Sequence, residues 1–153
     1  MSLDAVLGER FRSKRVWMPF YYDGACAEHL RQIGFTHVVH EQKDFFEQMQ
    51  DKAFLESVDV VIDNPPYTGE QVKVGILKAL AQWGKPFVLL LPSSVLFAQY
   101  LRESLDMSKV QAIFPRRVLV RKSGQEQVAF KYLIWLCYDC ELERDMMFTD
   151  QIS

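Results

Sequence analysis

The segment VDVVIDNPPY occupies residues 58–67, and the rest of the predicted architecture can be built outward from it. Its first half is almost entirely apolar, which is typical of a strand buried on both faces of a parallel sheet. The second half is a stiff corner, because Pro66 lacks an N–H and each residue before a proline is held extended. The carbonyl of Pro65 is therefore left without a local partner. Ligands bind at the carboxyl ends of strands in open α/β sheets, so we expect a functional site at this corner.

Strand-like and helix-like segments alternate on both sides of the corner. We expect strands near residues 15–19, 35–40, 58–62, 87–91, 110–114 and 129–138. Helical patterns lie near 25–33, 45–55, 68–83 and 94–105, with a stop at Gly84 and a cap at Ser93 or Ser94. This alternation predicts an α/β fold with a Rossmann-like, doubly wound, mostly parallel sheet of about six or seven strands. No helical pattern separates the last two strands, so we expect an antiparallel C-terminal hairpin.

Length and composition limit the classes of protein that the chain can belong to. Its 153 residues suit a single domain, with a core at about 15–138 and an acidic, solvated tail at about 139–153. No apolar run is long enough to span a membrane and the N-terminus lacks a signal-peptide core, so we expect no membrane association. The three cysteines do not suggest a disulfide framework, and we expect a cytoplasmic protein, or a nuclear one in a eukaryote. Cys137 and Cys140 have CxxC spacing without a second ligand pair, which favours buried thiols over a metal site, and we expect no metal.

The corner resembles the Asn-Pro-Pro-Tyr motif of S-adenosylmethionine-dependent amino-methyltransferases, which methylate the exocyclic amine of adenine. The resemblance implies catalytic roles for Asn64, Pro65, Pro66 and Tyr67. The Asn64 side-chain oxygen and the Pro65 carbonyl would accept the amine hydrogens and direct the lone pair at the methyl group, as electrostatic preorganisation. Pro66 would keep the corner stiff, and Tyr67 would stack on a base taken out of its helix. On the residues alone, the alternative is an Asn-Pro turn at a strand end.

The element order extends this resemblance, because a C-terminal hairpin on a Rossmann-like sheet is the pattern of class I methyltransferases. The family's first motif ends the first strand with an acidic residue, a proline, an aromatic residue and a Gly-x-Gly loop that admits the cofactor. Pro19 and Phe20 match this motif, and Gly24 matches its second glycine. Met18 stands at the acidic position and Tyr22 at the first glycine. Glycine allows a backbone to approach a ligand closely, so we expect Tyr22 to crowd the cofactor.

Four further residues complete the cofactor side that the resemblance implies, with S-adenosylmethionine as the cofactor. Asp23 would contact its ammonium group, or form an Asx turn before the helix. Glu41 follows the second strand, where this fold commonly binds ribose hydroxyls. Asp44 and Phe45 resemble the third motif, which contacts the adenine amine and ring. Their alternative role is a helix N-cap followed by a core phenylalanine.

The substrate side is expected at the loop between the last two strands. That loop emerges on the same edge as Tyr67 and is rich in basic residues, namely Arg116, Arg117, Arg121 and Lys122. Such side chains suit contacts to phosphates and would bind nucleic acid in a salt-dependent way. The alternative is a solvated hairpin tip. The net charge of −2 argues against a surface that is positive throughout.

These observations predict a methyltransferase acting on the exocyclic amine of adenine in RNA or DNA. We find no segment large enough for a target-recognition domain, so selectivity would require a partner subunit, a homodimer or a structured RNA. Two alternatives stay open. The substitution at Tyr22 fits a catalytically silent binding subunit with the same fold. Protein-glutamine methyltransferases also carry the Asn-Pro-Pro-Tyr motif, because a glutamine amide is another planar, poor nucleophile.

Overall fold

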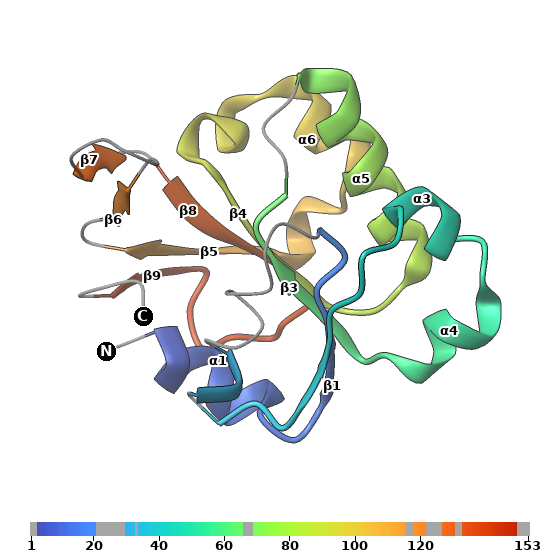
Figure 1. Ribbon diagram of the computed structural model, residues 1–153. Coiled ribbons are helices and arrows are strands. Elements are labelled where there is room, and N and C mark those ends of the chain that lie inside the picture. Colours follow the sequence, from blue (N-terminus) through green and yellow to red (C-terminus); the bar gives the residue numbers. More distant parts are fainter. Residues whose placement is uncertain are drawn as a thin grey trace.

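A seven-stranded sheet forms the centre of the molecule, with helices on both faces (Figure 1). The computed structural model describes residues 3–20, 30–32, 34–65, 69–115, 118–121, 127–130 and 133–149. The strand order is β2-β1-β3-β4-β8-β5-β9. The strands are β1 (Arg15–Trp17), β2 (His37–Val39), β3 (Val60–Asp63), β4 (Phe87–Pro92), β5 (Val110–Pro115), β8 (Leu133–Tyr138) and β9 (Met146–Thr149).

All strands of this sheet run in one direction except β8. The strand β8 lies antiparallel between β4 and β5, whereas β1 pairs in parallel with β2 and β3, and β3 with β4. This arrangement confirms the predicted α/β class, the mostly parallel sheet and the antiparallel C-terminal pair. The connection between β5 and β8 contains a separate two-stranded sheet of β6 (Val118–Arg121) and β7 (Gln127–Phe130). The expected strand at 129–138 is therefore divided between β7 and β8.

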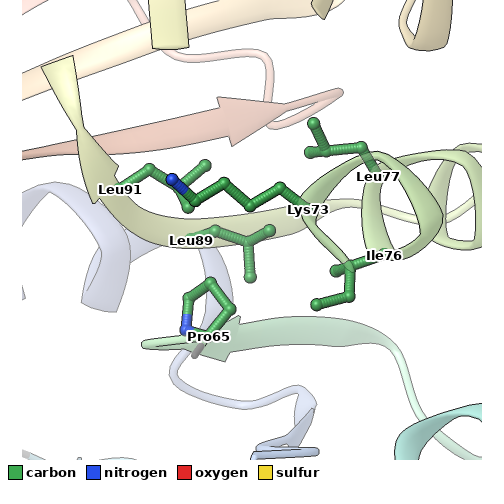
Figure 2. A pocket seen from close by; sticks show the side chains of 6 residues that line it. All are labelled: Pro65, Lys73, Ile76, Leu77, Leu89 and Leu91. Atoms are coloured by element: carbon green, nitrogen blue, oxygen red, sulfur yellow. The ribbon is translucent and has the colours of Figure 1, made fainter. Parts of the chain in front are cut away.

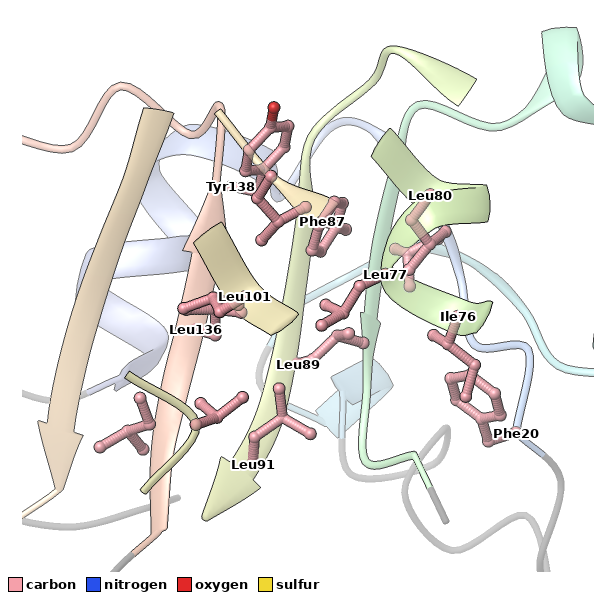
Figure 3. Close-up of a cluster of buried hydrophobic side chains, with 14 of the residues drawn as sticks. Phe20, Ile76, Leu77, Leu80, Phe87, Leu89, Leu91, Leu101, Leu136 and Tyr138 are labelled. Atoms are coloured by element: carbon pink, nitrogen blue, oxygen red, sulfur yellow. The ribbon is translucent and has the colours of Figure 1, made fainter. Parts of the chain in front are cut away.

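Alternate residues of the strands fill two apolar layers, one on each face of the sheet. The helix α1 (Leu3–Phe11) contributes Leu7 and Phe11 to the layer that also holds Val88 and Leu90 of β4. The opposite layer holds the remaining apolar residues of β4 and the buried side chains of α5 (Glu70–Trp83), as Figure 3 shows. Because both faces of the central strands are covered, apolar residues can follow one another along them, which explains the run at 60–62.

Two predicted helical regions differ from the structure in detail. The helix α5 begins after Gly69 and ends at Gly84, whose φ of 84° is left-handed, so the predicted stop is confirmed. The region 45–55 forms two short helices, α3 (Phe45–Gln48) and α4 (Lys52–Ser57). Of the helix expected at 25–33, only residues 30–32 lie in the described part of the chain, and they are helical.

The single helix expected at 94–105 is wrong. The structure has a 3-10 helix η1 (Ser93–Phe97) and a separate α6 (Gln99–Ser104), divided by an extended Ala98, and then a second 3-10 helix η2 (Met107–Lys109). Neither serine is a cap, because both lie inside η1. Val95 and Leu101 are both buried, and a separation of six positions along one α-helix would place them about 120° apart around its axis. The break at Ala98 allows both to face the sheet.

The expected solvated tail from residue 139 is also corrected by the structure. The strand β9 pairs in parallel with β5 and extends the sheet. Its Met147 and Thr149 are buried whereas Met146 and Phe148 are exposed, which is the alternation of a strand covered on one face. The acidic residues that suggested a tail lie before it, at positions 139–145, where Asp139 is half-buried and Glu141, Glu143 and Asp145 are exposed. Among the helices described, none has the length and apolarity needed to cross a bilayer.

Candidate functional site

The predicted corner lies at the carboxyl end of β3, in the middle of the sheet. Asp63 is the last residue of β3, and Asn64 and Pro65 follow it directly. The carboxyl ends of the parallel neighbours β1 and β4 lie on either side. Pro65 is buried and Asn64 is half-buried. The corner therefore has the position that open α/β sheets use for ligands. Pro66 and Tyr67 lie outside the described residues.

A buried carboxylate, Asp63, joins the corner to the end of β1. Its Oδ2 accepts the backbone N–H of Phe20 at 2.7 Å, and its Oδ1 accepts the backbone N–H of Asn64 at 2.7 Å. The side chain is only 2% exposed. Burial raises the pKa of Asp63 to about 7, and the two backbone hydrogen bonds oppose that rise in part. The predicted cofactor residue Phe20 and the predicted catalytic residue Asn64 are thus brought together through one carboxylate.

Aromatic rings pack beneath the end of β1. The ring of Phe45 lies 5.3 Å from that of Phe20 and 5.8 Å from that of Trp17, measured between centroids. Phe45 is buried, and the Asp44 side chain accepts the Glu47 N–H as the N-cap of α3. In the structure, Asp44 therefore has its alternative role as an N-cap, and Phe45 has its alternative role as a core residue. A contact of Asp44 or Phe45 with a cofactor stays a prediction. Pro19 is buried and immediately precedes Phe20.

Glu41 lies just beyond β2, which is the edge strand next to β1. Its carboxylate is exposed and forms an ion pair with Lys43 at 2.8 Å. This hydrogen bond and the charge of Glu41 raise the pKa of Lys43. The ends of β1 and β2 are held side by side, since the Met18 N–H donates to the Val39 carbonyl at 2.8 Å. Glu41 is therefore accessible at the edge where a ribose contact is predicted.

A narrow apolar crevice lies between the corner, β4 and α5 (Figure 2). It is too narrow to admit a water molecule, and its lining residues are Pro65, Lys73, Ile76, Leu77, Leu89 and Leu91. The stem of Lys73 runs from α5 along β4, and its ammonium group lies near Leu91. Long cationic side chains commonly cover apolar surface in this way while the charged end reaches water. Lys73 thus places a positive charge at the edge of the sheet that carries the corner.

A second hollow, of about 370 Å³, lies at the open edge of β2. Its lining residues are Arg15, Arg31, Thr36, His37, Val38 and Val39. It shares none of these residues with the crevice beside Pro65. The Arg31 guanidinium donates to the Val38 carbonyl at 3.4 Å and so covers part of this unpaired strand edge.

Several predicted site residues lie outside the part of the chain that the structure describes. They are Tyr22, Asp23 and Gly24 of the cofactor loop and Arg116, Arg117 and Lys122 of the basic loop. Arg121 belongs to β6, of which the backbone is described. The roles proposed for these residues stay predictions from the sequence.

The cysteine pair is buried, as expected. Cys137 and Cys140 are both free thiols with no exposed surface. A hydrogen bond with Cys140 and burial raise the pKa of Cys137, which favours the neutral thiol. Within the described ranges, no three His, Cys, Asp or Glu side chains are grouped so that they could hold a metal ion.

Sequence reasoning assigned no role to Asp63 or Lys73. The signal for Asp63 was an ionisable residue at the end of a strand that is otherwise apolar, where an aliphatic residue would be expected. The signal for Lys73 was weaker, because a lysine near the start of a helix is common. A role for Lys73 is suggested only by the structure, in which its side chain runs along β4 and lines the crevice with Pro65.

Comparison with known proteins identifies no relative by sequence. No family model matches the chain, and no curated protein matches it. Among solved structures, the crystal structure of Thermoplasma acidophilum 1320 matches with 10% identity and a TM-score of 0.49. That match covers 89% of this chain and 85% of the other. The fold class stated above rests on the strand order and directions.

Proposed function

We propose that this protein is an S-adenosylmethionine-dependent methyltransferase acting on the exocyclic amine of adenine in RNA or DNA. The observation that carries the proposal is the Asn64-Pro65 corner at the carboxyl end of β3, tied by Asp63 to the end of β1. In this arrangement the predicted amine-binding residues and the predicted cofactor strand share one edge of the sheet. The strand directions give support, because the resemblance to class I methyltransferases includes an antiparallel C-terminal pair on a mostly parallel sheet, and β8 is antiparallel to β5.

The chemistry requires two hydrogen-bond acceptors beside the amine. An adenine amine is a poor nucleophile because its lone pair is delocalised into the ring. The Asn64 side-chain oxygen and the Pro65 carbonyl would accept its hydrogens and favour a tetrahedral nitrogen. S-adenosylmethionine, when bound, supplies an electrophilic methyl group on its sulfonium. In such a transfer the N–C bond would form as the S–C bond breaks, with the electron pair kept on sulfur and the amine proton lost to water.

The described residues fit a cofactor at the ends of β1 and β2. Glu41 offers an exposed carboxylate for ribose hydroxyls, and the rings of Phe20 and Phe45 offer an apolar surface next to the end of β1. Both rings are more than nine-tenths buried, so only their margins are available for a ligand. Most of the contact with the methionine part would come from the loop at residues 22–24.

Nucleic acid is favoured over a protein amide by the charge beside the corner. Lys73 lines the crevice with Pro65, and its ammonium group, at the edge of the sheet outside the crevice, would meet the phosphate next to an extruded adenine. The basic residues 116–122 would add further phosphate contacts. A glutamine side chain on a protein would offer no such partner for these cations.

A methyl-transfer assay tests the proposal directly. Labelled S-adenosylmethionine is offered with single-stranded RNA, single-stranded DNA, duplexes and a glutamine-containing peptide, side by side. We expect label in an oligonucleotide, at the adenine amine, and a loss of turnover of about 10²-fold or more in Asn64→Ala with cofactor affinity nearly intact. Label in the peptide alone would replace adenine by a protein amide as the substrate.

The silent binding subunit is the second candidate, and Tyr22 at a glycine position is the observation that favours it. Calorimetry with S-adenosylmethionine separates the two functions. Binding at micromolar concentration supports the enzyme. Absence of binding by the folded chain supports the silent subunit, and Tyr22→Gly should then restore binding if crowding at this position is the cause.

A further inference from the structure

We infer that Asp63 is a positioning residue, whose buried carboxylate fixes the Asn64-Pro65 corner relative to the end of β1. Its effect on the reaction rests on the proposed function, whereas the bridge itself does not. Asp63 would touch neither adenine nor cofactor. It would act through the backbone of the two residues that begin the predicted binding segments.

The geometry of the bridge supports this role. Each oxygen of one rigid, planar carboxylate accepts one backbone N–H at 2.7 Å, and the two donors, Phe20 and Asn64, are 44 residues apart along the chain. Phe20 is the last described residue before the predicted cofactor loop. The side chain of Asn64 is the predicted acceptor of an amine hydrogen, and the backbone N–H of the same residue donates to Asp63. A single side chain therefore links the backbones of the two segments directly.

The reaction is sensitive to that relative position. In-line transfer requires the amine nitrogen and the methyl carbon to approach along one line, and an error of about 1 Å in placement can reduce a rate about 10²-fold. The ordinary ladder between β1 and β3 ends at Trp17 and Val61, before the corner. Beyond this last pair, the hydrogen bond from the Phe20 N–H to the Asp63 carboxylate links the end of β1 to the end of β3.

Burial indicates that strand pairing alone does not explain Asp63. Val60, Val61 and Ile62 are all apolar, and an apolar residue at position 63 would avoid the unfavourable desolvation of a carboxylate. Asp59 offers a matched control, because its Oδ2 also accepts a backbone N–H of β1, from Arg15 at 2.8 Å, but in an exposed position. A link between the strands can thus be made without burying a charge.

Amide hydrogen exchange tests the bridge without reference to activity. In the wild-type protein we expect slow exchange at Phe20 and Asn64. Asp63→Asn replaces one acceptor oxygen by an NH₂ donor, so exchange at one or both sites should accelerate about tenfold or more after correction for intrinsic rates. Asp59→Asn should leave both sites unchanged. If Asp63→Asn does not fold, Asp63→Ala removes both acceptor oxygens without adding a donor. Unchanged exchange at both sites in the folded variant would overturn the bridge.

Methyl transfer per folded molecule tests the positioning role. We expect Asp63→Asn to reduce kcat about 10- to 100-fold with the cofactor Kd changed less than about threefold, and Asp59→Asn to retain the wild-type kcat. A merely structural role predicts normal kcat in the fraction that is folded, and that result would overturn positioning even if exchange is accelerated. If the wild-type protein transfers no methyl group to any substrate, the proposed function fails, and with it the catalytic effect of Asp63. The exchange measurement then decides the bridge alone.

Discussion

The two ends of the β1–β3 pair use the same residue type for the same hydrogen bond, in opposite environments. At the amino end, Asp59 accepts the Arg15 N–H, and its own N–H donates to the Arg15 carbonyl at 2.8 Å. At the carboxyl end, Asp63 accepts the Phe20 N–H. Asp59 is exposed to water, whereas Asp63 is 2% exposed and the pKa of its carboxyl is raised to about 7.

The difference shows that the same hydrogen bond contributes differently to stability in an exposed and in a buried environment. An exposed aspartate remains hydrated and can be replaced with little effect on folding. A buried aspartate loses hydration, and its hydrogen bonds offset that loss only in part. Residues that weaken a fold locally are found where function requires a defined geometry. The buried end is also the end that carries the Asn-Pro corner.

The largest expected effect is on the pH dependence of stability. The folded pKa of Asp63 is about 7 and the pKa of an unperturbed aspartate is 3.8, so between these pH values the folded state binds more protons than the unfolded state. The stabilising contribution is therefore complete below pH 3.8 and is lost as pH rises through 7. Its full size is about 4 kcal/mol at 1.36 kcal/mol per pKa unit. Urea unfolding from pH 4.5 to 8 should show this fall in wild type and Asp59→Asn. An equal fall in Asp63→Asn would contradict the assignment to Asp63.

Removal of each carboxylate at low pH gives the next largest contrast. At pH 5 most Asp63 is protonated in the folded state, so desolvation of a charge contributes little. Asp63→Ala then leaves the Phe20 and Asn64 N–H groups without their acceptor, and we expect a loss of about 2–3 kcal/mol in the free energy of unfolding. Asp59→Ala should lower it much less, because water can replace that carboxylate. Equal losses in the two variants would remove the distinction between the two ends.

The crevice beside the corner provides a comparison of two lysines on α5. Lys73 lines the crevice together with Pro65, whereas Lys78 is exposed further along the same helix. We expect Lys73→Met to weaken binding of an adenine-containing oligonucleotide about threefold to tenfold and to reduce the salt slope by about one. Lys78→Met should change neither. Fluorescence anisotropy at several salt concentrations measures both quantities, and identical behaviour of the two variants would exclude the phosphate contact of Lys73.

The smallest effect separates the two roles of Asp44. Asp44 and Asp51 cap α3 and α4, each accepting a backbone N–H at 3.1 Å. Alanine at either position should lower the free energy of unfolding by about 1 kcal/mol. Asp44→Ser restores a cap without a carboxylate, so a contact with the cofactor predicts weaker S-adenosylmethionine binding in this variant than in Asp51→Ser. If the two serine variants bind the cofactor equally, Asp44 is a cap alone.

Local patterns explain which features could be predicted. The buried strand expected near 58–62 and the helix stop at Gly84 follow from neighbouring residues, and the structure contains both, as β3 at 60–63 and as the end of α5. Of the corner after the strand, the structure describes Asn64 and Pro65. The break at Ala98 and the strand β9 were missed, because both depend on which side chains the sheet has space to cover. The buried Cys137 was predicted correctly because its strand is apolar along its whole length.

The amino-acid order by itself determined the alternation of strands and helices, the stiffness of the diproline corner and the residue types available for an amine and a phosphate. These properties depend on backbone sterics and on periodicity over a few residues. Tertiary structure decided that β8 lies between β4 and β5 and that Asp63 is buried where Asp59 is exposed. Tertiary structure also decided that Phe20 meets a carboxylate 43 positions away. Such pairings are set by the joint burial of distant apolar surfaces, and no local pattern encodes which partner will be chosen.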